Sequence, residues 1–210
     1  MKVILINGSP HEQGCIFTAL SEIKTELSKN GIDSEIFHVG QNPIRGCTAC
    51  GECRKNGGIC KYGDEDSVNE GIKKIIEADG VVVGSAVHFA AASGAITSFM
   101  DRVFYSNSGK FAFKPGASVV SCRRAGNLTA FDQLNKYFTI ANMPVVPSQY
   151  WNCIYGNTAE EASKDLEGLQ TMRTLAKNMA WMLKCFEAGK AAGVEFPKPE
   201  EEKLRTNFIR

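Results

Sequence analysis

Short apolar segments alternate with segments of helical periodicity along most of the chain. Apolar or β-branched runs that stop at glycine, asparagine or serine predict strands; they cover residues 2–6, 34–39, 80–84, 117–122 and 145–154. Apolar residues spaced three or four apart predict helices between these strands; they cover residues 16–27, 68–76, 96–103 and 128–141. A fifth helix is predicted from Thr158, which forms a capping-box pattern with Glu161, to Gly189.

Five successive strand–helix units predict one α/β domain. Right-handed crossovers place helices on both faces of a parallel sheet, so the expected fold is a doubly wound, five-stranded parallel sheet. We assign residues 1–190 to this domain, with a cysteine-rich loop at 42–63, and residues 191–210 to a charged C-terminal tail. In such folds ligands bind at the carboxyl ends of the strands, so the loops after the first, third and fourth strands are the expected site.

The composition narrows the function classes. The chain is 43% hydrophobic and 22% charged, with a formal net charge of +1, so no charge excess points to nucleic acid or to an anionic membrane. No stretch reaches the roughly 18 apolar residues of a membrane span, and the few apolar residues before Asn7 are too short for a signal-peptide core. We therefore expect a cytoplasmic protein.

The first loop has the composition of a phosphate site. Its glycines allow tight turns, hydroxyls are available, and the following helix offers free N–H groups at its amino terminus. The candidate ligands are Ser9, His11, Gly14, Cys15, Ile16 and Thr18. Cys15 and Ile16 stand where a P-loop NTPase has lysine and serine or threonine, and the second predicted strand lacks the terminal acid of a dinucleotide-binding fold. Cys15 is interpreted as a small buried residue, with a thiol pKa lowered by the helix terminus as the alternative.

Two segments resemble those of NAD(P)H-dependent FMN reductases, which are flavodoxin-like proteins. Residues 8–20 are similar to the family's phosphate loop, and residues 85–102 to its isoalloxazine-binding loop and helix. The resemblance implies FMN as cofactor, with Ala86, Val87, His88 and Phe89 at the ring. The family usually has Pro-Val-Tyr at 86–88, so here His88 or Phe89 would replace the stacking tyrosine.

The loop after the fourth strand carries the remaining flavin candidates, which are Arg123, Arg124 and Gly126. Reduced FMN is negatively charged near N1, and an arginine there would stabilise that charge. We therefore expect at least one of the two arginines to face the flavin or a nicotinamide phosphate. On the predicted helix over 96–103, the neighbouring residues Asp101 and Arg102 are interpreted as an ion pair rather than as catalytic groups.

Four of the eight cysteines are clustered, in the pattern C-x2-C-x2-C-x6-C formed by Cys47, Cys50, Cys53 and Cys60. Compact spacing of this kind is typical of [4Fe–4S] ligation, whereas zinc usually takes two separated C-x2-C pairs. An iron–sulfur cluster, metal-free thiols or a disulfide, and zinc all remain open. The pattern resembles that of flavodoxin-like iron–sulfur flavoproteins. That resemblance implies electron transfer between cluster and FMN across a dimer contact, and dimers of dimers.

Two functions follow from this pattern. The first is an FMN-dependent oxidoreductase that takes electrons from NAD(P)H and passes them to a quinone, a nitro or azo compound, a flavin or a protein. The alternative is an iron–sulfur flavoprotein that acts as an electron carrier or redox sensor with a ferredoxin-like partner. We predict no catalytic side chain, because hydride transfer is the cofactor's own reaction. We expect a homodimer or homotetramer, and the cysteine cluster beside the flavin edge.

Overall fold

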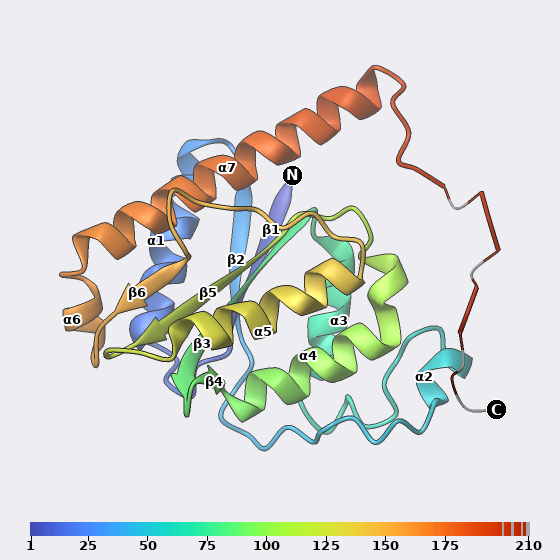
Figure 1. Cartoon of the computed structure of the whole chain (residues 1–210), viewed down its shortest axis with the longest axis horizontal. Helices are drawn as coiled ribbons and strands as arrows, with labels where there is room; N and C mark the ends of the chain where they lie inside the picture. The colour runs from blue at the N-terminus through green and yellow to red at the C-terminus, as the bar shows by residue number, and fades with distance from the viewer. Residues whose placement is uncertain (199, 203, 207, 209–210) are drawn as a thin grey trace.

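The computed structural model describes residues 1–198, 200–202, 204–206 and 208. Residues 199, 203, 207, 209 and 210 of the predicted tail at 191–210 lie outside the described residues. Its centre is a parallel sheet of five strands in the order β2-β1-β3-β5-β6 (Figure 1). The strand bounds are β1 Lys2–Asn7, β2 Asp33–His38, β3 Gly80–His88, β5 Gly116–Cys122 and β6 Cys153–Tyr155. The prediction of a doubly wound, five-stranded parallel sheet is confirmed, and one short strand is added to it. This strand, β4 (Ala91–Ala92), pairs antiparallel with the end of β3.

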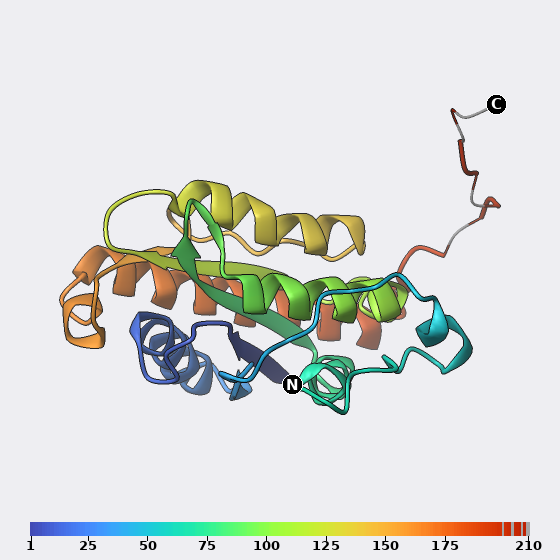
Figure 2. The ribbon, with the colours of Figure 1, turned by 90° about the horizontal axis from the view of Figure 1, so that it is seen from below.

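Helices cover both faces of the sheet (Figures 1 and 2). Their bounds are α1 Cys15–Lys29, α2 Glu52–Lys55, α3 Val68–Glu77, α4 Gly94–Asn107, α5 Asn127–Ile140, α6 Ala159–Ala162 and α7 Leu166–Ala191, with a 3-10 turn at Ser108–Lys110. One apolar core lies between the sheet and α3, α4 and α5, and a second lies between the sheet and α1 and α7. Successive side chains of β1 point to opposite faces of the sheet, so Ile4 and Ile6 pack in the first core and Val3 and Leu5 in the second.

The structure corrects three predicted boundaries. Strand β3 continues past residue 84 to His88, because the hairpin with β4 extends it. The predicted strand over 145–154 is a single bridge from Val145 to Gly116 followed by β6, since Pro147 cannot donate to a ladder. The predicted helix from Thr158 is two helices: Thr158 caps only the short α6, and Asp165 caps α7 by accepting from the Gly168 N–H.

Close backbone approach at two glycines fixes the first loop against β3. The Gly8 N–H donates to the Gly84 carbonyl at 2.8 Å. A Cβ on Gly84 would lie 2.5 Å from Ile16 Cγ2, and a Cβ on Gly8 would lie 2.6 Å from Ile96. Helices α1 and α4 therefore pack directly on the strand ends. In the part of the chain that the structure describes, no helix is long and apolar enough to cross a membrane.

Substitution of Gly84 tests this packing. We predict that Gly84→Ala lowers the free energy of unfolding by about 1–3 kcal/mol, because the new methyl group would overlap the Ile16 side chain in a filled core. Denaturant unfolding followed by circular dichroism measures the change. Gly94→Ala is the matched control, because nothing lies within 4 Å of a Cβ built there. Equal stability of the two variants would contradict the close approach.

Candidate functional site

Three loops meet at the carboxyl edge of the sheet. The first loop, between β1 and α1, is tied to the amino end of α4, because Ser93 Oγ donates to the Gly8 carbonyl at 2.8 Å. The tip of the β3–β4 hairpin touches the loop between β5 and α5, where a Cβ on Gly126 would lie 2.9 Å from Ala90 Cα. The predicted loops after the first, third and fourth parallel strands are thus brought together.

Asn7 at the end of β1 shapes the first loop. Its buried side chain accepts from the Ser9 N–H at 3.0 Å and donates from Nδ2 to the Glu12 carbonyl at 2.9 Å. Ser9 Oγ accepts from the His11 N–H at 3.1 Å, and the His38 ring is hydrogen-bonded to the Ser9 carbonyl at 2.8 Å. Sequence reasoning missed Asn7 and His38, although both lie at the ends of predicted strands.

Helix α1 begins beneath this loop without a side-chain cap. Its N-cap residue is Gly14, no side chain accepts from the first turn, and that turn contains no acidic residue. The first N–H groups of a helix have no intrahelical partner, and they favour an anion. Ser9 Oγ lies 3.8 Å from the position of a Cβ on Gly14, so glycine keeps the space next to these N–H groups open.

The other phosphate candidates have different surroundings. Thr18 Oγ1 donates to the Gly14 carbonyl at 3.3 Å, and His11 is exposed on the loop. The Ile16 side chain is fully buried in the core, so only its backbone N–H belongs to the loop. The Cys15 thiol donates to the Thr158 carbonyl at 3.2 Å, and burial raises its pKa. This contradicts the alternative of a thiol pKa lowered by the helix terminus, because burial outweighs that effect.

The β3–β4 hairpin presents the ring candidates. Ala86 and Val87 lie partly buried in β3, and His88 is exposed at its end. Phe89 and Ala90 form the two-residue turn with φ of +50° and +60°. Positive φ at both central residues is typical of a type I′ turn, which strongly favours asparagine and glycine. Phe89 is fully exposed, so an aromatic ring stands in solvent on a strained backbone at the edge of the site.

The loop after β5 places its arginines at the surface. Arg123 and Arg124 are exposed. Gly126, the N-cap residue of α5, has a φ of +86°. Next to it, the buried Asn127 donates from Nδ2 to the Tyr155 hydroxyl at 2.9 Å. This bond joins the loop to the end of β6.

All four clustered cysteines line one pocket. Its other walls come from the same loop and from the carboxyl-terminal half of α4; they are Gly46, Thr48, Gly51, Lys61, Tyr62, Arg102, Tyr105 and Ser106. Cys47 and Cys50 are exposed, whereas Cys53 is buried on α2. A hydrogen bond from the backbone of Glu52 lowers the pKa of the Cys50 thiol. Across residues 1–198, 200–202, 204–206 and 208, no three histidine, cysteine, aspartate or glutamate side chains are placed to hold one metal ion.

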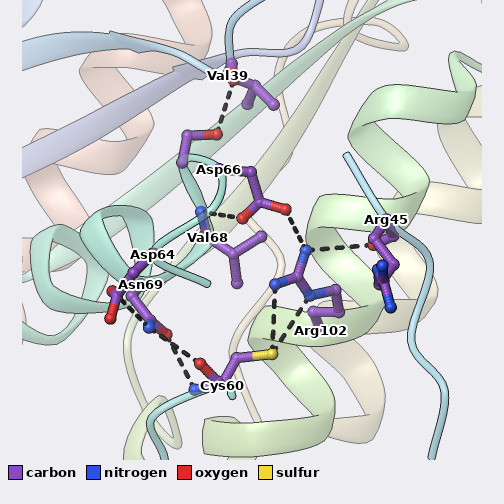
Figure 3. Close-up of polar contacts among 9 residues, drawn as sticks. Val39, Arg45, Cys60, Asp64, Asp66, Val68, Asn69 and Arg102 are labelled. Carbon is purple, nitrogen blue, oxygen red and sulfur yellow. Dashed lines mark hydrogen bonds and ion pairs between the residues drawn. The ribbon is translucent and has the colours of Figure 1, made fainter. Parts of the chain in front are cut away.

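Arg102 of α4 is the polar centre of this region (Figure 3). Its Nε and Nη2 each donate to Cys60 Sγ at 3.3 Å, and its Nη1 donates to the Arg45 carbonyl at 3.2 Å and to Asp66. Both members of the Arg102–Asp66 ion pair are almost completely buried. Arg102 and Asp101 do not pair with each other as predicted. Arg102 pairs with Asp66, and Asp101 accepts instead from the Tyr137 hydroxyl.

The cysteine pocket is separated from the junction of the three loops along α4. Arg102 is eight residues after Gly94, the first residue of α4, so the rise of 1.5 Å per residue sets it about 12 Å from the amino end of the helix. That amino end belongs to the junction of the three loops. Figures 1 and 2 agree that α2 lies beyond the other end of α4. The cysteine pocket and the loop junction are therefore separated along α4 within one chain, and the placement of the cluster beside the flavin edge stays a prediction.

Comparison with protein families and curated proteins gives a consistent assignment. The family model for NADPH-dependent FMN reductase matches residues 1–158. An iron–sulfur flavoprotein of Methanocaldococcus jannaschii is 31% identical over 88% of this chain and 98% of the relative. An iron–sulfur flavoprotein of Methanosarcina thermophila is 27% identical over 89% of this chain and 97% of the relative.

Solved structures show the same fold at low sequence identity. RosB, crystallised with 8-demethyl-8-formylriboflavin-5'-phosphate, has a TM-score of 0.70 and 14% identity, with 100% of this chain and 92% of RosB covered. A flavodoxin from the domain Archaea has a TM-score of 0.58 and 16% identity, with 88% and 99% covered. The fold is therefore flavodoxin-like. With the family match and the curated relatives, the chain belongs to the NADPH-dependent FMN reductase family of flavoprotein oxidoreductases and is related to its iron–sulfur flavoproteins.

Proposed function

We propose that this chain is an FMN-dependent oxidoreductase that also holds a [4Fe–4S] cluster on Cys47, Cys50, Cys53 and Cys60. The observation that carries the proposal is the presence of two separate candidate sites. One is the junction of three loops above the uncapped amino end of α1, and the other is the pocket lined by all four cysteines. A protein with both sites can accept electrons in pairs at one and release them singly at the other.

The residues of the first site fit FMN. Ser9, Thr18 and the first N–H groups of α1 would hold the phosphate, and Gly14 keeps their surface open. His88, Phe89 and Gly126 would border the ring from the other two loops, while Arg123 or Arg124 would add positive charge. Bound FMN supplies hydride and single-electron transfer. The protein's part is to orient the ring and to set the local charge, so no catalytic acid or base is required.

The residues of the second site fit a cluster better than a single zinc ion. Zinc sites usually take two well-separated C-x2-C pairs, which Cys47, Cys50, Cys53 and Cys60 do not form. Their compact spacing is typical of cysteines that bind the separate iron atoms of one cubane. The pocket wall contains Lys61 and Arg102 but no carboxylate. This charge balance suits an anionic, thiolate-bound cluster.

The cysteine pocket also supports a second candidate function, that of an electron carrier or redox sensor with a ferredoxin-like partner. Cys47 and Cys50 are exposed at the pocket, so a cluster there would be within reach of another protein. The two candidates differ in the source of electrons. The enzyme takes them from NAD(P)H, whereas the carrier takes them from a protein.

A charge at the α1 terminus tests the FMN site. We predict that Gly14→Asp weakens FMN binding about 100-fold relative to Gly14→Asn, because its carboxylate would occupy the anion position within about 4 Å of the phosphate. Either side chain can cap α1, and both add the same Cβ, 3.0 Å from His11 Cβ. Isothermal titration of the flavin-free proteins measures both affinities, and denaturant unfolding checks their stability. Equal affinities would place the phosphate elsewhere.

Serine substitutions test the cysteine site. We predict that Cys53→Ser and Cys60→Ser lose most of the iron found in the anaerobically purified parent protein, since each removes one thiolate ligand. Cys185→Ser is the control, because Cys185 is exposed on α7 outside the pocket. Iron and acid-labile sulfide are assayed on each protein. If the Cys53 and Cys60 variants keep their iron, the assigned ligands are wrong.

The donor test separates the two functions. The enzyme predicts steady-state oxidation of NADH or NADPH with a quinone acceptor at saturating FMN, because hydride transfer to the bound ring is then possible. Absorbance at the nicotinamide band follows the reaction. The absence of turnover with both nucleotides, together with rapid reduction by a reduced ferredoxin, would reject the enzyme and leave the carrier.

A further inference from the structure

The way Arg102 distributes its donors is unusual for a buried ion pair. A guanidinium normally offers its parallel N–H donors to a carboxylate as a two-pronged contact. Here the Nε and Nη2 edge is directed at Cys60 Sγ, with both distances 3.3 Å, and Asp66 receives only Nη1. Figure 3 shows the guanidinium plane between the sulfur and the carboxylate. The ion pair with Asp66 alone does not explain why the Nε and Nη2 edge of Arg102 is directed at Cys60 Sγ.

Asp66 fixes the guanidinium from the other side. Its Oδ1 accepts from the Val68 N–H at 3.1 Å at the start of α3, and its Oδ2 accepts from Arg102 Nη1. Beside it, Ser67 Oγ donates to the Val39 carbonyl at 2.7 Å. The carboxylate is thus anchored to the start of α3, and Ser67 ties the same turn to the residue after β2, so both sides of the contact with Arg102 are fixed by the core.

The backbone of Cys60 is held as firmly as its sulfur. Asn69 Oδ1 accepts from the Cys60 N–H at 2.9 Å, and Asn69 Nδ2 donates to the Cys60 carbonyl at 3.0 Å. Asn69 lies on α3 and Arg102 on α4, so two helices of the core fix one cysteine of the surface loop. Cys47 and Cys50, by contrast, lie exposed on the loop itself.

We propose that Arg102 is a positioning residue of the cysteine site, which holds the Cys60 sulfur in place as a ligand and raises the reduction potential of the cluster bound there. This inference rests on the proposed iron–sulfur function. Hydrogen bonds to ligand sulfur atoms and nearby positive charge both stabilise the more negative, reduced state of a cluster. In a cluster held there, the added electron would be stabilised by the two N–H groups that Arg102 donates to Cys60 Sγ, and no proton or bond would need to change.

The test compares cluster potentials in anaerobically purified protein. Arg102→Lys keeps one charge but not the two-pronged contact. The double variant Asp66→Asn/Arg102→Gln removes both charges without leaving a buried carboxylate unpaired. We expect a lower midpoint potential in both, with the larger drop in the double variant, measured by redox titration followed by electron paramagnetic resonance. Arg173→Gln is the control, because it removes an arginine charge on α7 that is paired with Glu22, and α7 packs on the core at the other face of the sheet.

Each result decides a different claim. Unchanged potentials in both Arg102 variants, with a cluster present, would overturn the role of Arg102 and leave the iron–sulfur function standing. Loss of iron from these variants but not from Arg173→Gln, with a native circular dichroism spectrum, would support the positioning role. A parent protein without iron and sulfide would contradict the proposed function and this role with it.

Discussion

The buried contact between Arg102, Asp66 and Cys60 is the constraint on which the cysteine region depends. Most side chains from Gln41 to Cys50 are exposed, so that segment has little apolar surface to bury. It is tied to the core by the bond from Arg102 Nη1 to the Arg45 carbonyl at 3.2 Å and by Ile44, which packs against the first apolar core. Removing one partner of a buried ion pair generally costs about 3–5 kcal/mol, because the other charge is left unpaired. The unfavourable free energy of an unpaired buried charge therefore keeps Arg102 against Asp66, and this position also brings the guanidinium to Cys60 Sγ.

The junction of the three loops is organised differently. There the close approach of Gly8, Gly84 and Gly126 to neighbouring elements sets the loops on a filled apolar core. Because the apolar core holds these loops, the first N–H groups of α1 have no side-chain cap, and Arg123 and Arg124 lie exposed at the surface. One half of α4 borders each site. Its capped amino end lies at the loop junction, and its carboxyl-terminal half carries Arg102 and Tyr105 to the cysteine pocket.

Much of this was predictable from local pattern. The apolar runs gave the parallel strands, and the spacing of Cys47, Cys50, Cys53 and Cys60 predicted a shared pocket. Long-range contacts were not predictable. Arg102 is 36 residues from Asp66 and 42 from Cys60, so no local spacing announces their contact. The turn at Phe89 and Ala90 lacks the glycine or asparagine that marks such hairpins. Thr158 has a true capping pattern, but only the packing shows that its helix ends after one turn.

The most direct test of the account is the metal content of the parent protein purified without oxygen. The ultraviolet–visible spectrum, iron and acid-labile sulfide are measured on one sample. The account predicts flavin bands with a broad iron–sulfur shoulder and about four irons and four sulfides per chain. Flavin bands with no iron or sulfide, or with zinc bound instead, would contradict the assignment of the cysteine pocket to a cluster.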